Sequence, residues 1–184
     1  MKVVGVDLAG SQRNDTGFCV LTVDESDKKE VSVRLLKTDE EIIQHILEAQ
    51  PQVIAIDSPL TYKGSIRRCD ELLAGYGVLS PTLPGMEILA KRGTNLAEKL
   101  RQTAEVIEIS VKTSAKILGV AADKNDLRYQ KNLMNLNIGG DITTRFLTKD
   151  ELDAIVAAST AFLYTTGSTE KVGDENGTII TPKV

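Results

Sequence analysis

Three aspartates lie at the ends of apolar segments, where a carboxylate is costly unless something positive compensates it. Asp7 and Asp57 each close a short run of aliphatic residues, and Asp153, with Asp150 one helical turn earlier, opens a third. Three such residues on separate elements indicate a shared cation. Because neither His nor Cys accompanies them, we expect a hard divalent ion, Mg²⁺ or Mn²⁺, held by Asp7, Asp57 and Asp153.

Clustered carboxylates of this kind suit phosphodiester hydrolysis. Two divalent ions roughly 4 Å apart activate a water and stabilise the leaving oxygen of a phosphodiester. In this scheme Asp7 bridges the ions, while Asp57 and Asp153 hold one each. Asp150 or Glu108 orients the water. The sequence therefore predicts a metal-dependent nuclease that acts on DNA or RNA.

Asp150 and Asp153 are three residues apart, so they share one face of a helix. Ala157 and Ala161 continue the Asp153 face at four-residue steps, and such small side chains allow a helix axis to approach a sheet closely. We expect this helix to carry Asp153 towards Asp7. The alternative for Asp150 alone is that it complements the charge of the helix N-terminus.

Glu108 is an acid within the apolar segment Val106–Ile109. Because strand side chains alternate with a period of two, Glu108 faces the core if Val106 does. The alternative is a solvent-facing position on an edge strand. The first arrangement adds a further carboxylate to the expected site.

The charge of the chain is unevenly distributed, although the net charge is −4. Residues 61–131 contain 12 Lys and Arg against 8 Asp and Glu, whereas the rest of the chain is acidic. This basic segment is consistent with a polyanion-binding face, and solvated helix faces are the alternative. On the first interpretation the phosphate contacts come from Lys63, Arg67, Arg68 and Arg92. The two adjacent arginines could instead pair with Asp70 and Glu71.

These residues must be positioned by a mixed sheet. The patterns of apolar residues predict three antiparallel strands, a capped helix, a buried strand, a helical segment, a further strand and then more helices. Strands are expected over 2–8, 16–23, 31–35, 52–57, 105–110 and, at an edge, 177–182. Helices are expected over 39–49, 66–74 and 86–102, the last with an interruption near Gly93. A further helix is expected to start with residues 114–118, and another is expected over 149–165.

This order of elements is that of the RNase H-like fold, an α/β fold with a mixed five-stranded sheet flanked by helices. We expect one domain over residues 1–184, with 61–103 as a helical insertion after the fourth strand. In that fold the first and fourth strands pair. Asp7 and Asp57 would then lie near each other at one edge of the sheet.

Composition excludes several functional classes. The chain has no Trp and few aromatic residues, so a base-stacking platform for single strands is not expected. One histidine, His45, and two cysteines, Cys19 and Cys69, are too few for a zinc site or for catalysis centred on histidine, and we expect both thiols to be reduced. With no membrane-span-length apolar run and no signal-peptide pattern, a cytoplasmic protein without membrane contact is predicted.

Several motifs resemble those of domain-of-unknown-function family 429, whose members are described as predicted nucleases of RNase H fold. The motifs are Gly5-Val-Asp-Leu-Ala-Gly10 with Thr16-Gly17, Ala55-Ile-Asp-Ser-Pro59, Arg68-Cys-Asp-Glu-Leu72, Pro84-Gly85-Met86 with Arg92-Gly93, Val106-Ile-Glu-Ile109, and Leu147-Thr-Lys-Asp-Glu-Leu-Asp-Ala154. Their order and spacing extend through most of the chain. The resemblance implies an RNase H-like fold and nuclease activity.

The segment from Asp150 to Asp153 also looks like the closing helix of Holliday-junction resolvases in the same superfamily. By that likeness Asp7, Asp57, Asp150 and Asp153 are metal-binding acids. Resolvase-type enzymes usually carry Glu on the fourth strand, where this chain has Asp57. In addition, the segment that follows Glu108 often contains Pro in family 429, where this chain has Ser-Val.

Two other functional classes stay open. The pattern Gly5-x-Asp7-x-x-Gly10 resembles the phosphate loop of actin-like sugar and acid kinases. Those proteins duplicate the fold, and 184 residues leave no second lobe to enclose ATP unless the chain works as a homodimer. The other class is a non-catalytic nucleic-acid-binding module, which the acidic net charge favours and the complete set of acids disfavours. Metal binding and nucleotide binding separate these classes from the nuclease.

Overall fold

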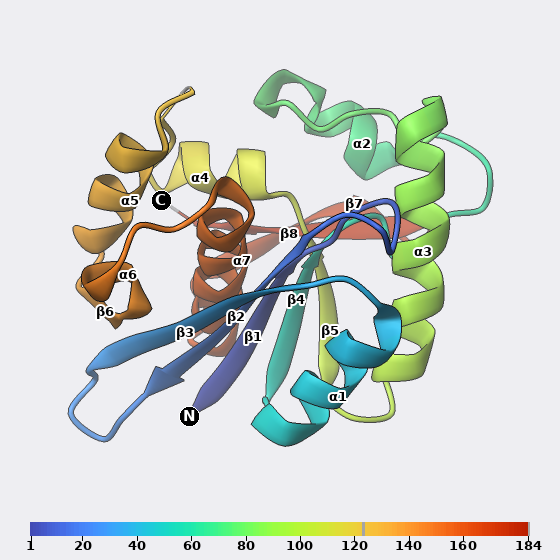
Figure 1. Ribbon diagram of the computed structural model, residues 1–184. Helices are drawn as coiled ribbons and strands as arrows, with labels where there is room; N and C mark the ends of the chain where they lie inside the picture. Colours follow the sequence, from blue (N-terminus) through green and yellow to red (C-terminus); the bar gives the residue numbers. More distant parts are fainter. Residues whose placement is uncertain (123, 184) are drawn as a thin grey trace.

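The computed structural model describes residues 1–122 and 124–183, and within them the chain forms an eight-stranded mixed sheet with helices on both faces (Figure 1). The strand order is β6-β3-β2-β1-β4-β5-β8-β7. The strands are β1 Lys2–Asp7, β2 Thr16–Val23, β3 Lys29–Leu36, β4 Val53–Asp57, β5 Glu105–Ile109, β6 Ile138–Gly140, β7 Thr169–Asp174 and β8 Gly177–Pro182. The five expected core strands are therefore present, and the further strand expected over 177–182 is β8, although it lies between β5 and β7 rather than at the edge. Strands β6 and β7 were not expected, and with β8 they extend the sheet to eight strands.

The central strands β1 and β4 are apolar along their length and end in aspartate. They pair in parallel, with Val6 opposite Ile56, and each is flanked by a further strand, antiparallel β2 or parallel β5. Strands that are covered on both faces consist of nearly continuous aliphatic residues, as these do. Because parallel neighbours end at the same edge of a sheet, Asp7 and Asp57 emerge there together.

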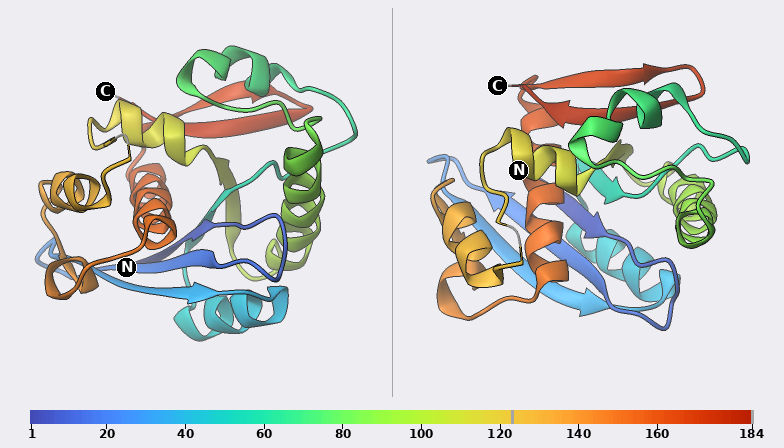
Figure 2. Two further views of the ribbon diagram at one scale, coloured as in Figure 1. Left: turned by 45° about the horizontal axis from the view of Figure 1, so that its top comes forward. Right: turned by 90° about the horizontal axis from the view of Figure 1, so that it is seen from above.

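Two layers of helices cover the sheet (Figures 1 and 2). One face packs against α1 (Asp39–Ala49) and α3 (Pro84–Leu100). The other packs against α4 (Val111–Ile117), α5 (Asp126–Met134) and α7 (Lys149–Thr165), with the short α6 (Asp141–Thr144) beside β3. None of the helices in the described part of the chain is long and apolar enough to cross a membrane.

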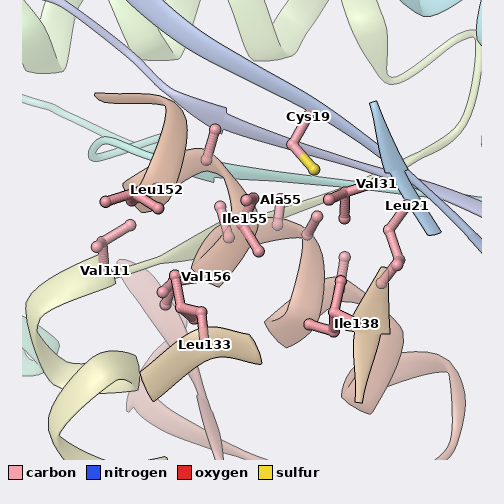
Figure 3. Close-up of a cluster of buried hydrophobic side chains, with 14 of the residues drawn as sticks. Cys19, Leu21, Val31, Ala55, Val111, Leu133, Ile138, Leu152, Ile155 and Val156 are labelled. Atoms are coloured by element: carbon pink, nitrogen blue, oxygen red, sulfur yellow. The ribbon is translucent and has the colours of Figure 1, made fainter. Parts of the chain in front are cut away.

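Helix α7 lies directly on the middle of the sheet, and Figure 3 shows its side chains Leu152, Ile155 and Val156 in the core on that face. Two glycines allow this close approach. A Cβ atom at Gly5 would overlap the backbone of α7, and one at Gly17 would overlap the carbonyl group at its first turn. The first turn of α7 is therefore held against the ends of β1 and β2.

The start of α7 is fixed by a capping box. The Thr148 hydroxyl oxygen accepts the Glu151 N–H at 3.3 Å, and the Glu151 carboxylate accepts the Thr148 N–H at 2.9 Å. Burial of Glu151 is outweighed by its bonds to Arg145 (2.6 Å) and Thr148, so the pKa of Glu151 is lowered and the carboxylate stays ionised. This cap fixes the direction in which the next helical turn presents its acids.

Segment 61–103 contains α2 (Arg68–Leu72), the 3₁₀ turn η1 (Ala74–Tyr76) and α3. The helix expected over 66–74 is shorter, and α3 continues without the expected interruption at Gly93. A Cβ there would overlap the hydroxyl of Ser58, so this glycine allows α3 to pack onto the end of β4.

Helix α4 begins at Val111, earlier than expected, because the Ser110 side chain caps it. Both cysteines are buried and free, as expected.

Candidate metal centre

Asp7, Asp57 and Asp153 line one cavity of about 500 Å³ at the carboxyl ends of the central strands. Asp7 and Asp57 follow the paired residues at the ends of β1 and β4. Asp153 comes from the first turns of α7, which the contact between Gly17 and Asp150 holds over the start of β2. The three acids that the sequence assigned to metal binding are thus brought together, and their function as ligands stays a prediction.

Asp150 lies beside Asp7 in a second cavity. It lines a separate, shallow cavity with Asp7, Asp15 and Lys37 and does not line the cavity that contains Asp57 and Asp153. Burial, then the charge of Asp153, raises the pKa of Asp150 against the opposing effect of Lys149. Asp150 therefore adds negative charge beside Asp7, and its expected role in catalysis stays a prediction.

The electrostatics of the cluster favour a bound cation. Burial raises the pKa of Asp7 well above its ordinary value, and the charges of Asp57, Asp153 and Asp150 add to the effect. Burial also raises the pKa of Asp57 to about 7, against a backbone hydrogen bond from Val111 that lowers it. Such shifts mean that neighbouring carboxylates resist being ionised together. A donor set made only of carboxylate oxygens with excess negative charge fits Mg²⁺ or Mn²⁺.

Two side chains hold the carboxylate of Asp153. The Tyr129 hydroxyl of α5 donates to Oδ1 at 2.9 Å, and the Lys149 ammonium donates to Oδ2. Burial, together with Asp153, raises the pKa of Tyr129, so its hydroxyl keeps its proton and remains a donor. No local pattern points to this tyrosine, because its contact depends on how α5 packs against α7.

Glu108 faces the core, as one of the two alternatives predicted, but it does so within a buried ion cluster. Its carboxylate accepts hydrogen bonds from both terminal nitrogens of Arg67, at 2.8 and 2.6 Å, and from the Leu60 N–H at 2.7 Å. Arg67 also binds Asp70 at 2.8 Å. Since these bonds balance the charge of Glu108 and engage both of its carboxylate oxygens, the expected role of Glu108 in orienting a water is not supported.

The same cluster includes one group of potential metal ligands, Cys69, Asp70 and Glu108, whose donor atoms all lie within 4.8 Å of one another. The guanidinium group of Arg67 binds both carboxylates of this group. Because the guanidinium group of Arg67 already supplies the positive charge that these two carboxylates require, we interpret this cluster as structural rather than as a metal site.

The four basic residues expected to contact phosphate lie in different surroundings. Arg67 is buried in the cluster just described, and buried Arg92 donates to Asp39 and to the carbonyl groups of Ala9 and Lys37. These two guanidinium groups are engaged within the fold, which contradicts their assignment to phosphate. Arg68 is exposed and pairs with Glu71, the alternative considered from the sequence, and Lys63 is exposed.

A different set of basic residues shares the cavity with the carboxylates. Lys112 and Lys116 of α4 and Lys124, just before α5, line the same cavity as the three aspartates, together with Lys149. Three of the four lie in the basic segment 61–131, but their spacing gave no indication that they face the acids. The lining of the cavity thus combines carboxylates with ammonium groups, a composition suited to a metal ion and a phosphate group.

No protein-family model and no curated protein matches the chain, so the resemblance to family 429 is not confirmed by these comparisons. Solved structures to which the chain is similar include RuvC and Ydc2. RuvC from Thermus thermophilus matches with a TM-score of 0.56 and 13% identity over 91% of this chain and 97% of RuvC. The yeast mitochondrial Holliday junction resolvase Ydc2 matches with a TM-score of 0.50 and 14% identity over 85% of this chain and 75% of Ydc2. Together with the sheet topology, these matches show an RNase H-like fold.

Proposed function

We propose that this protein is a metal-dependent nuclease that hydrolyses phosphodiester bonds of DNA or RNA. The observation that carries the proposal is the convergence of Asp7, Asp57 and Asp153 in one cavity that is also lined by lysines. The likeness of the fold to RuvC and to the resolvase Ydc2 is consistent with this activity, and the chemistry of the cavity provides the independent argument.

In this proposal Asp7, Asp57 and Asp153 would hold Mg²⁺ or Mn²⁺. When bound, such ions supply an activated water and a counter-charge for the leaving oxygen. Tyr129 keeps the Asp153 carboxylate in one orientation, as partners of metal ligands commonly do. Lys112 and Lys124 attract the phosphates on either side of the bond that is cleaved.

The kinase-like alternative loses part of its support. The likeness to a phosphate loop relied on Gly5 and Gly10, and Gly5 instead lies beneath α7, where any side chain would overlap the helix backbone. Its glycine is thus explained by packing. A non-catalytic nucleic-acid-binding module would keep the lysines and lack cleavage, so an activity measurement separates it from the nuclease.

The test is cleavage of end-labelled single-stranded, duplex, hybrid and four-way-junction substrates with Mg²⁺, with Mn²⁺ and with EDTA. Wild type is compared with Asp7→Asn and with Glu98→Gln, a control that removes one exposed negative charge on α3. We expect metal-dependent cleavage by wild type and Glu98→Gln and a loss of at least about a hundredfold in Asp7→Asn. Equal cleavage by Asp7→Asn, or no cleavage of any substrate by wild type, would contradict the proposal.

A further inference from the structure

Lys149 and Asp153 form an ion pair at the edge of the carboxylate cluster. They are four residues apart on α7, and the Lys149 ammonium donates to Oδ2 of Asp153. The other oxygen, Oδ1, accepts the Tyr129 hydroxyl. Both oxygens of this carboxylate therefore already have a donor within the chain.

The two donors differ in how easily they can leave. Tyr129 is 5% exposed and packed in the core. The side chain of Lys149 is 63% exposed, whereas that of Asp153 is 7% exposed. Lys149 is also the first residue of α7, where a long side chain is free to turn into solvent without moving the helix. The ammonium group can therefore withdraw while the tyrosine stays.

A divalent cation at Asp153 would be placed beside this ammonium group. Like charges a few ångströms apart repel strongly at a partly buried site. The ion would therefore have to displace Lys149 before it could bind Asp153 together with Asp7 and Asp57.

We propose that Lys149 is an internal counter-ion, which neutralises Asp153 in the metal-free protein and is exchanged for a divalent cation. The inference rests on the proposed metal centre, and it assigns Lys149 a role through Asp153 rather than in the reaction. It explains how the fold tolerates three neighbouring carboxylates before metal binds. It also sets a threshold for metal binding. An ion can enter only if its free energy of binding to the three carboxylates exceeds the free energy lost when the ion pair breaks.

The experiment is calorimetric titration of Mn²⁺ into the metal-free protein, without nucleic acid, for wild type and four variants. Lys149→Met removes the competing ammonium, and Lys149→Arg keeps a cation in its place. Lys116→Met is the matched control, because Lys116 lines the same cavity but donates to the carbonyl of Tyr76 at 2.8 Å. Asp57→Asn removes one of the three carboxylates.

We expect Lys149→Met to bind Mn²⁺ about fivefold more tightly than wild type, the gain from removing one largely exposed competing charge. Lys116→Met and Lys149→Arg should stay within about threefold, and Asp57→Asn should bind more weakly. In EDTA, Lys149→Met should also unfold at a lower temperature than wild type, which checks that the ion pair exists without metal.

Two results would overturn the inference in different ways. If Lys149→Met binds Mn²⁺ no more tightly than Lys116→Met, Lys149 is not the competing cation, and the proposed nuclease is unaffected. If neither wild type nor Lys149→Met binds Mn²⁺, the metal centre itself is wrong, and the proposed function falls together with the inference.

Discussion

The carbonyl group of Asp150 lies over Gly17, in the space that a Cβ atom of Gly17 would occupy. Gly17 is the antiparallel partner of Asp7 across β2 and β1. One backbone contact therefore sets the height of the first turn of α7 above the strand end that carries Asp7. The distance between Asp153 and the other two acids depends on it.

Gly17→Ala is expected to destabilise the protein and to displace the acids of α7. The new methyl group meets backbone rather than a flexible side chain, so the helix must shift, and the free energy of unfolding should fall by about 3 kcal/mol. Urea unfolding measures the change. Gly75→Ala is the control, because a Cβ at Gly75 has open space around it. Equal stability of the two variants would contradict the close packing of α7.

Asp57→Asn should stabilise the metal-free protein at high pH. The folded-state pKa of Asp57 is about 7, above the unfolded value of about 3.9, so the folded state binds this proton more tightly. The contribution to stability is complete below about pH 4 and is lost as the pH rises through 7. The neutral amide avoids that loss, and we expect a gain of about 2 kcal/mol at pH 8 that shrinks towards zero at pH 4.

Urea unfolding in EDTA at both pH values provides the measurement, with exposed Glu98→Gln as the control for loss of one negative charge. A gain of the same size at pH 4 and pH 8 would show that burial of the Asp57 charge is not its cause. A variant less stable than wild type at pH 8 would show the same.

Glu108→Gln should affect stability rather than metal binding. Removing one partner of a buried ion pair costs about 3–5 kcal/mol, and because Asp70 still pairs with Arg67 we expect about 2 kcal/mol here. Glu71→Gln breaks an exposed pair of the same type with Arg68 and should cost less than about 1 kcal/mol. Denaturant unfolding compares the two. A normal stability together with lost Mn²⁺ affinity would return Glu108 to the metal centre.

Tyr129→Phe should weaken metal binding while leaving the fold intact. Loss of the hydroxyl frees Oδ1 of Asp153 and lets the carboxylate rotate, so Mn²⁺ affinity should fall about tenfold, while stability changes by about 1 kcal/mol. Tyr164→Phe is the control, since its hydroxyl donates to Glu105, away from the cavity. If both variants bind Mn²⁺ as wild type does in calorimetric titration, Tyr129 has no role in holding the site.

The strand ends could be predicted from the sequence because their signals are local. An aliphatic run that stops at Asp7 or Asp57 indicates a buried strand with an acid at its end, and parallel pairing brings such ends to one edge. The strand β7 could not be found in this way. Its residues are mostly exposed and do not alternate, and it pairs only with β8 among the described strands.

The surroundings of the acids could not be predicted, because they depend on contacts between distant segments. Arg92 forms a hydrogen bond to Asp39, which is 53 residues earlier, and Tyr129 of α5 donates to Asp153 of α7. The residues next to a lysine or arginine in the sequence do not indicate whether its side chain forms an ion pair within the fold or lines a cavity. The sequence therefore indicated the acids and misassigned two of their expected basic partners.

The most direct test of the shared cation is anomalous diffraction from crystals of the protein grown or soaked with Mn²⁺. We predict an anomalous peak within about 2.0–2.6 Å of carboxylate oxygens from Asp7, Asp57 and Asp153, with the Lys149 ammonium withdrawn from Asp153. A peak beside Asp70 and Glu108 instead, or no peak at the three aspartates when Mn²⁺ is bound elsewhere, would contradict the account.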